Sequence, residues 1–409
     1  MQKKLHFFII DDDEAINEQI TRLLSAKGHK VSSYTSSKNA LSEIIAKQPD
    51  CVLCDLLLPG VDGLELYKEI RKTNEIKQPV FIIVTGKRYE FDRRHALDLG
   101  IDGYINKPLN EKTFAYDLLD IINEPITIEF WGCRGTLPIP GKGAIRYGGN
   151  TNCVSLCIAK KQFFIFDAGT GIKVLSDYLV NEKKLPISAK IFITHPHYDH
   201  ISGIPFFVPL YMKGNEFEIL GADQASINLE KFVGDLMDSV YFPVTMKEFS
   251  AKIDFCSLKE SEFDIGDVHI KTLLLNHPGR TLGYRVEYKN KVFSYITDNE
   301  LFLEDSPHFI QADVDRLIQF IHKSDVLIMD TTYDDETYLN KIGWGHSCVS
   351  RVIDVADKAD IKLLCLYHHD PAQSDDDIDL KLHHAKELLK ARHSKTKCIA
   401  PKEGERITI

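Results

Sequence analysis

The stretch Thr194-His195-Pro196-His197-Tyr198-Asp199-His200 places four potential metal ligands within six positions of the chain. The apolar residues before it, 190–193, predict a buried strand. Those after it, 201–210, predict the start of a mostly apolar helix. The ligand-type side chains therefore stand on a strand-to-helix turn, where neighbours in the sequence can point toward two different centres.

This turn can contribute to two metal sites. His195 and His197 can bind one ion, and Asp199 and His200 can bind a second. Neutral imidazole and carboxylate ligands favour zinc, and manganese or iron is compatible with the same donors. The motif is the signature of the metallo-β-lactamase superfamily, which the chain resembles from about residue 126 to its end. The resemblance implies an αββα sandwich that acts as a metallohydrolase.

The resemblance also implies the rest of a ligand set, with each member at the end of an apolar, strand-like run. His277 corresponds to the third ligand of the first metal, and Asp298 corresponds to a carboxylate that bridges both metals. His368 corresponds to the last ligand of the second metal, with His369 as the alternative. Asp199 counts among the expected catalytic residues as well, because its charge anchors the metal pair.

One further histidine points to phosphoester chemistry. Gly345-His346-Ser347 precedes a predicted helix over 349–359 and resembles the Gly-His-Ser/Thr element of ribonuclease Z and of the phosphoribosyl cyclic phosphodiesterases. In those families this histidine assists catalysis as an acid or oxyanion stabiliser and binds no metal, and the resemblance implies that role for His346. The number of residues between His346 and His368 matches the spacing of the corresponding histidines in those families. This favours His368 over His369 as the metal ligand.

The residues before 124 show a second, independent pattern, in which apolar runs alternate with helix-length segments. The strand-like runs are 5–10, 51–54, 80–84 and 103–106. This alternation predicts a doubly wound parallel sheet that binds ligands at the carboxyl ends of its strands. Asp11, Asp12 and Asp55 stand there, and three converging carboxylates favour a shared Mg²⁺. Thr85 and Lys107 add a hydroxyl and a cation that can steady a phosphoryl group.

This arrangement resembles the receiver domain of two-component response regulators, which implies a five-stranded parallel sheet. By that resemblance Asp55 is phosphorylated, with a cognate sensor histidine kinase as partner. The positions that bind magnesium and form the switch are then Asp11, Asp12, Thr85, Tyr104 and Lys107. Receivers commonly form homodimers or contact their output domains through the face that corresponds here to 86–93.

Length and composition fit two domains, which we place at 1–123 and 126–409. The join at Asn123-Glu124-Pro125 has no Gly/Ser-rich linker, so we expect the domains to pack directly. We find no signal peptide and no apolar run of about 18 residues, so no membrane partner is expected. Nine scattered cysteines favour a reducing cytoplasm.

The net charge of −10 argues against a protein that grips nucleic acid. Acidic residues follow the last histidine pair, which favours a small phosphoester over a polynucleotide. Arg134 or Arg146 is a candidate for neutralising the substrate phosphate. Residues 211–250 are a candidate lid, in which Tyr241 or Phe242 either stacks on a nucleobase or packs in the core.

The sequence therefore predicts a phosphorylation-controlled response regulator whose output is a dinuclear-metal phosphodiesterase for a small or cyclic phosphoester. Two alternatives remain open. One is a nuclease of the ribonuclease Z type, which a basic face would support. The other is a signalling module without enzymatic activity, in which the metal site is structural. The expected His346 weighs against the second, since a structural site needs no additional acid.

Overall fold

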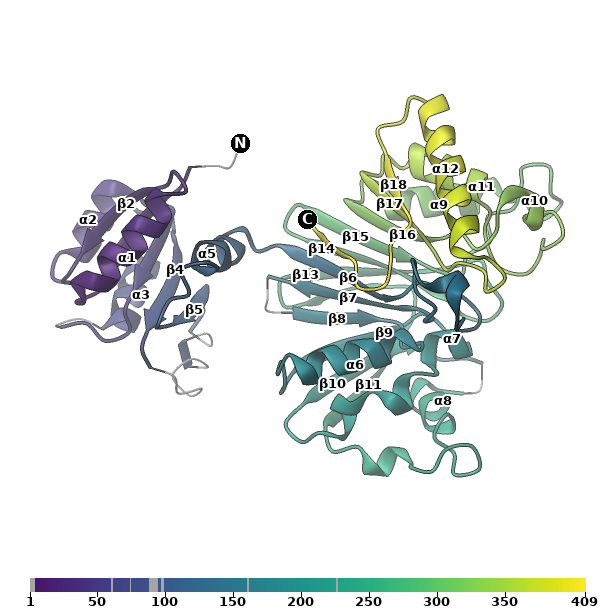
Figure 1. The fold of residues 1–409 in the computed structure, drawn as a ribbon, viewed down its shortest axis with the longest axis horizontal. Coiled ribbons are helices and arrows are strands. Elements are labelled where there is room, and N and C mark those ends of the chain that lie inside the picture. The colour runs from purple at the N-terminus through teal and green to yellow at the C-terminus, as the bar shows by residue number, and fades with distance from the viewer. Residues whose placement is uncertain are drawn as a thin grey trace. The chain divides into compact units, whose positions relative to one another are not determined.

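The computed structural model describes residues 4–59, 62–73, 75–87, 95–96, 99–159, 162–225 and 227–409. The chain divides into two compact units, Met1–Pro125 and Ile126–Ile409 (Figure 1). Most of the receiver face predicted at 86–93, from residue 88 onward, lies outside the described residues.

The first unit is a five-stranded parallel sheet with the strand order β2-β1-β3-β4-β5. Its strands are β1 (His6–Ile10), β2 (Lys30–Tyr34), β3 (Cys51–Cys54), β4 (Val80–Thr85) and β5 (Gly103–Asn106). Its described helices are α1 (Glu14–Ser25), α2 (Ala40–Lys47), α3 (Gly63–Lys72) and α5 (Phe114–Asn123). This confirms the predicted doubly wound parallel sheet.

The composition of the strands explains which of them could be predicted from the sequence. Strands β1 and β3 are buried at every position, as expected for parallel strands that are covered on both faces. Strand β2 escaped prediction because its sequence Lys-Val-Ser-Ser-Tyr is mostly polar and lies at the sheet edge. Asp13 caps helix α1 by accepting a hydrogen bond from the backbone N–H of Ala15 at 2.9 Å.

The second unit contains two seven-stranded mixed sheets. The first has the order β11-β10-β9-β8-β7-β6-β19 and consists of β6 (Ile126–Gly132), β7 (Cys153–Ile158), β8 (Gln162–Phe166), β9 (Ser188–Ile193), β10 (Glu216–Ala222), β11 (Lys252–Leu258) and β19 (Arg406–Thr408). The second has the order β12-β13-β14-β15-β16-β17-β18 and consists of β12 (Glu262–Ile265), β13 (Val268–Leu274), β14 (Leu282–Tyr288), β15 (Lys291–Ile296), β16 (Val326–Asp330), β17 (Leu363–Tyr367) and β18 (Lys397–Ile399).

Helices cover the outer faces of both sheets. Those on the first sheet are α6 (Gly171–Asn181), α7 (Tyr198–Ile201) and α8 (Leu229–Asp235). Those on the second sheet are α9 (Gln311–Ile321), α11 (Val349–Lys358) and α12 (Asp375–Ala391), while the short helix α10 (Asp335–Tyr338) lies between β16 and α11 in the chain. Figure 1 shows α6 and α8 on one side of the paired sheets and α9, α11 and α12 on the other. This confirms the predicted αββα sandwich.

An aromatic core joins the two sheets. Phe166 of β8 is fully buried and contacts rings from both sheets. Its ring neighbours, with centroids 5.2–5.7 Å away, are Phe192, Tyr284, Phe293 and Tyr295. Aromatic pairs at such distances add specific contacts to the area that they bury, so this cluster fixes how the sheets face each other.

The helix predicted over 201–210 is wrong as a regular helix. Helix α7 ends at Ile201, and two short 3-10 turns follow at Ile204–Phe206 and Val208–Tyr211. Pro205 and Pro209 lack the backbone N–H that a continuous α-helix needs, which explains the break. Within the described ranges, every helix is too short or too polar to cross a bilayer.

We expect Phe166→Ala to destabilise the second unit by about 3–5 kcal/mol, because the ring leaves a cavity among four others. Both tryptophans, Trp131 and Trp344, lie in this unit, so urea unfolding followed by tryptophan fluorescence reports on it alone. Phe206→Ala is the matched control, since Phe206 is 52% exposed. A loss for Phe166→Ala no larger than for Phe206→Ala would contradict the assigned core.

Candidate metal centre

The predicted metal ligands meet where strands of both sheets end. The turn from His195 to His200 follows β9 of the first sheet, while Asp298 and His368 follow β15 and β17 of the second. Asp298 and His368 have φ angles of 53° and 61°. Left-handed backbone is costly for residues other than glycine and concentrates at functional sites.

The first group of donors consists of His195, His197, His277 and Asp298, whose ligand atoms lie within 4.8 Å of one another. His197 Nδ1 is 2.8 Å from His195 Nε2 and 3.2 Å from His277 Nε2. Asp298 Oδ1 is 3.7 Å from His195 Nε2 and 3.8 Å from His277 Nε2. Nitrogen ligands of a tetrahedral zinc ion lie roughly 3.3 Å apart, so this group fits one ion.

The second group consists of Asp199, His200 and His368. Asp199 Oδ2 is 3.2 Å from His200 Nε2 and 3.1 Å from His368 Nε2. The other oxygen of Asp298, Oδ2, is 3.1 Å from His200 Nε2 and 3.3 Å from His368 Nε2. Asp298 thus turns one oxygen toward each group, which is the arrangement of a carboxylate that bridges two ions.

The charges of these groups fit cation binding. Burial alone would raise the pKa of Asp298, but His200 and His368 hold it well below the ordinary range. Burial and nearby His200 lower the pKa of His195 well below its usual value, so that ring is neutral. Burial would also lower the pKa of His200, but Asp199 and Asp298 raise it well above its usual value, so a metal ion bound by His200 would displace a proton. Metals bind neutral imidazole and ionised carboxylate, and buried carboxylates need a compensating cation.

Hydrogen bonds orient the ligand histidines. Asp167 accepts from His200 Nδ1 at 2.8 Å and from the backbone N–H of Thr194 at 2.8 Å. The carbonyl of Gly345 lies 2.8 Å from His277 Nδ1. Such contacts fix which ring nitrogen faces the metal site.

His346 lies beside these groups, and its strongest partner is a residue that the sequence did not reveal. Its Nδ1 is 2.8 Å from Oδ2 of Asp330, a fully buried carboxylate at the end of β16. Burial opposes protonation, but Asp330 raises the pKa of His346 to about 9. The His346 ring stacks on His368 with 4.8 Å between centroids. The sequence feature that could have revealed Asp330 is that the apolar strand β16 ends in an aspartate. Asp298 stands in a similar place, two residues after the end of β15.

The structure separates the two candidate histidines after β17. His368 faces Asp199 and Asp298, as described above, whereas His369 belongs to neither donor group. The His369 ring is fully buried, 6.1 Å from the ring of Tyr147, and both of its nitrogens lack a hydrogen-bond partner among the described residues.

Neither arginine proposed as a phosphate ligand reaches the cleft. The guanidinium of Arg134 is fully buried and donates to the carbonyls of Gly148 at 3.0 Å and Gln373 at 2.6 Å. Arg146 pairs with Asp376 at 2.7 Å. Both are held by the loop before α12 and its first turn, so part of the acidic run after His369 serves packing, and the phosphate-binding expectation is wrong.

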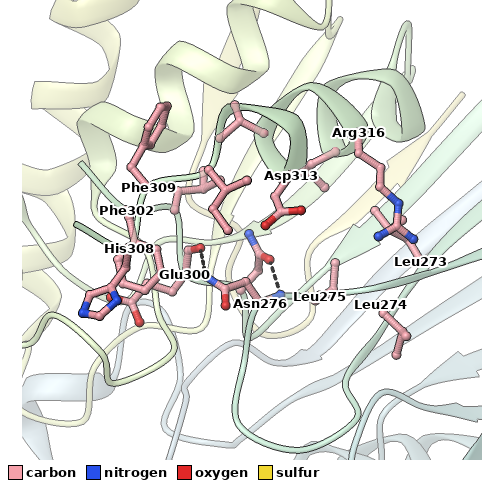
Figure 2. Close-up of a pocket in the computed structure, with 15 residues that line it drawn as sticks. Leu273, Leu274, Leu275, Asn276, Glu300, Phe302, His308, Phe309, Asp313 and Arg316 are labelled. Atoms are coloured by element: carbon pink, nitrogen blue, oxygen red, sulfur yellow. Dashed lines mark hydrogen bonds between the residues drawn. The ribbon is translucent and has the colours of Figure 1, made fainter. Parts of the chain in front are cut away.

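A cleft of about 510 Å³ opens over the two donor groups. Its lining residues are Thr136, Pro196, His197, Tyr198, Asp199, His277, Pro278, Asp298, Trp344, His346 and His368. A separate cavity of about 270 Å³ is lined by Asn276 and Glu300, and there Asn276 Nδ2 donates to the carbonyl of Glu300 at 2.8 Å (Figure 2). This bond ties the segment that carries His277 to the one that carries Asp298.

The first unit assembles its predicted phosphorylation site. Lys107 Nζ lies 2.6 Å from Asp11 Oδ2 and 2.7 Å from Asp55 Oδ2. Asp12 is exposed beside them, and donor oxygens of all three acids lie within 4.8 Å of one another. Burial raises the pKa of Asp11 despite the contact with Lys107, a penalty that a bound Mg²⁺ would relieve.

The two predicted switch residues both contact the segment that follows β4. Thr85 is buried at the end of β4, and its Oγ1 accepts from the backbone N–H of Lys87 at 3.4 Å. Tyr104 is half-buried and donates through its hydroxyl to the carbonyl of Lys87 at 3.3 Å. Both switch residues therefore contact the same segment after β4.

We expect Asp199→Asn to remove one of two bound metal ions per chain, because Asp199 Oδ2 contacts both histidines of the second group. His346→Ala should retain both ions, since its Nδ1 is engaged by Asp330. Elemental analysis of the purified variants measures the ratio. Loss of an ion in His346→Ala would show that His346 is itself a ligand.

Comparison with known proteins identifies both units. Residues 7–118 match the response regulator receiver domain, and residues 163–369, just over half of the chain, match the beta-lactamase superfamily domain. The transcriptional regulatory protein AfsQ1 of Streptomyces coelicolor is 33% identical over 101 residues, which cover 25% of this chain and 44% of that protein. The response regulator MprA of Mycolicibacterium vanbaalenii is 33% identical over 104 residues, with the same coverage.

The chain thus spans less than half of the length of the curated relatives that it matches. Among solved structures, the metallo-beta-lactamase fold protein YhfI from Bacillus subtilis aligns with a TM-score of 0.50 and 17% identity, covering 70% of this chain and 100% of YhfI. That likeness shows the fold. The chain belongs to the beta-lactamase superfamily, and a response regulator receiver domain precedes the domain that places it there.

Proposed function

We propose that the second unit is a dinuclear-metal phosphodiesterase that acts on a small or cyclic phosphoester, and that phosphorylation of Asp55 controls it. The observation that carries the proposal is the position of Asp298 between two donor groups, with His346 beside them in the same cleft. Zinc suits this histidine-rich set best, and manganese or iron would fit the same donors.

Two ions bound here would lower the pKa of a water molecule for attack and neutralise the phosphoryl oxygens. The residues of the chain supply the remaining steps. Asp199 and Asp298 hold the negative charge that retains the ions. Asp330 fixes the ring of His346 through Nδ1 and favours its protonated form, so that His346 can donate a proton to the leaving oxygen or stabilise the charge that develops there.

The shape and charge of the cleft favour a small substrate. A volume of about 510 Å³ lies in the range of small-molecule sites. Among the described residues, no lysine or arginine lines the cleft. A nuclease gains much of its affinity from such cations, which argues against the ribonuclease Z type of activity.

We expect the metal-loaded protein to cleave bis-p-nitrophenyl phosphate and to leave the β-lactam nitrocefin intact. His346→Ala should slow cleavage of an alkyl phosphodiester by roughly 10²–10⁴-fold, because an alkoxide leaving group needs a proton. The loss on bis-p-nitrophenyl phosphate should be much smaller, since p-nitrophenolate leaves unprotonated. Turnover of nitrocefin without diester cleavage would refute the phosphodiesterase proposal.

Comparing the two substrates also tests the role of His346. Equal losses on both diesters would show that His346 stabilises the oxyanion or orders its loop instead of donating a proton. Asp330→Asn is the companion variant, since it keeps the size of the residue but removes the charge 2.8 Å from His346 Nδ1. Asp330→Asn should also slow cleavage of the alkyl diester more than that of bis-p-nitrophenyl phosphate, but by a smaller factor than His346→Ala does.

We expect phosphorylation of Asp55 to raise diesterase activity by roughly 5–150-fold, the usual range of coupling between sites. A phosphoryl group would compete for Lys107, which now bonds both Asp11 and Asp55, and would draw in Thr85. The rate is measured with and without beryllofluoride and Mg²⁺, with Asp55→Asn as the unresponsive control. A change of less than about twofold in the wild type would refute the proposed control.

A further inference from the structure

Two large aromatic side chains stand exposed in the cleft over the metal-binding groups. Tyr198 is 77% exposed and Trp344 is 58% exposed, and both line the cleft. Tyr198 lies between the donors His197 and Asp199, whereas Trp344 lies in the loop between α10 and α11, two residues before His346. Rings of this size are usually buried, so exposed ones beside a reactive centre indicate a binding surface.

The loop that carries Trp344 is fixed from both sides. The carboxylate of Glu300 accepts hydrogen bonds from the backbone N–H groups of Gly343 and Gly345, each at 2.8 Å. These glycines have φ angles of 85° and 86°, which side chains rarely adopt. Glu300 also accepts from the hydroxyl of Tyr338 at 2.9 Å. The ring is therefore presented by a rigid loop, which lowers the ordering cost of binding a ligand.

The ring of Trp344 is also in contact with a lysine side chain. Lys341 Nζ lies 3.7 Å from its centroid, close enough for a cation–π interaction. This contact further holds the indole in place, and more than half of the side chain stays exposed. Because Lys341 covers one face of the indole, a planar ligand would stack on the other face.

We propose that Tyr198 and Trp344 bind a planar aromatic group of the substrate, so that the preferred substrate is a nucleoside phosphoester. This inference rests on the proposed phosphodiesterase function. The reacting phosphoryl group would lie at the metal-binding groups, and both rings stand within two residues of groups that would contact it. A nucleobase linked to phosphate through one sugar matches a small cleft with stacking rings near its reactive end.

The aromatic residues expected in the candidate lid do not take this role. Tyr241 is 83% exposed but does not line the cleft, and Phe242 packs edge-on against Phe206 at 5.4 Å. Tyr241 is therefore a matched control, because it is an exposed tyrosine of the same unit that lies away from the metal-binding groups.

The test compares adenosine 5′-monophosphate with ribose 5-phosphate, which has the same phosphate and sugar but no base. The zinc-loaded full-length protein is titrated with each by calorimetry and by tryptophan fluorescence. Trp131 is buried, so quenching of exposed tryptophan reports on Trp344. We expect adenosine 5′-monophosphate to bind roughly 5- to 150-fold more tightly, the range for one stacked base, and to quench Trp344.

The variants assign the preference to the two rings. Trp344→Ala and Tyr198→Ala should each reduce the ratio of the two affinities, Trp344→Phe should keep part of it, and Tyr241→Ala should leave it unchanged. Equal affinities in the wild type, or a preference that survives both alanine substitutions, would overturn the inference. Cleavage of bis-p-nitrophenyl phosphate together with equal affinities would leave the proposed function standing, whereas base-dependent binding without any diester cleavage would refute the function alone.

Discussion

The carboxylate of Asp298 links the two donor groups at the strand ends of the second unit. It is 2% exposed, stands in left-handed backbone, and lies between the imidazoles of His195 and His277 on one side and those of His200 and His368 on the other. These histidines come from both sheets, so two bound cations would tie the carboxyl ends of the sheets to each other. Metal binding and correct sheet packing are therefore expected to stabilise one another.

A second layer of groups gives this centre its chemistry. Asp167 holds His200, Gly345 holds His277, and Asp330 holds His346. Asp330 differs from the other two because it orients a histidine to which we assign no metal and which, in the proposed function, acts on the substrate. The same loop that places His346 also presents Trp344, and Glu300 fixes that loop through two backbone N–H groups. The residues that we propose for catalysis and for substrate specificity thus share one support.

The sequence predicted most of the architecture, and the structure brings the residues of the predicted donor set together. The predictions that failed have physical reasons. The ligands between His195 and His200 could be predicted from the sequence because they are close together in the chain. His277, Asp298 and His368 are far apart in the chain, so they could be assigned only through the family resemblance. Asp330 was missed because an aspartate at the end of an apolar strand is a weak signal, and only the fold shows its contact with His346. Arg134 was misread because only the fold shows that its donors are used by Gly148 and Gln373. The prediction of a helix over 201–210 failed because the apolar pattern there is interrupted by two prolines, which break a regular α-helix.

The measurement that tests the central claim most directly is anomalous X-ray diffraction from crystals of the zinc-loaded protein. The account predicts two anomalous peaks roughly 3.5–4 Å apart, one on each side of the Asp298 carboxylate. One peak would lie among His195, His197 and His277, and the other among Asp199, His200 and His368. A single peak, or a pair of peaks without Asp298 between them, would contradict the dinuclear centre.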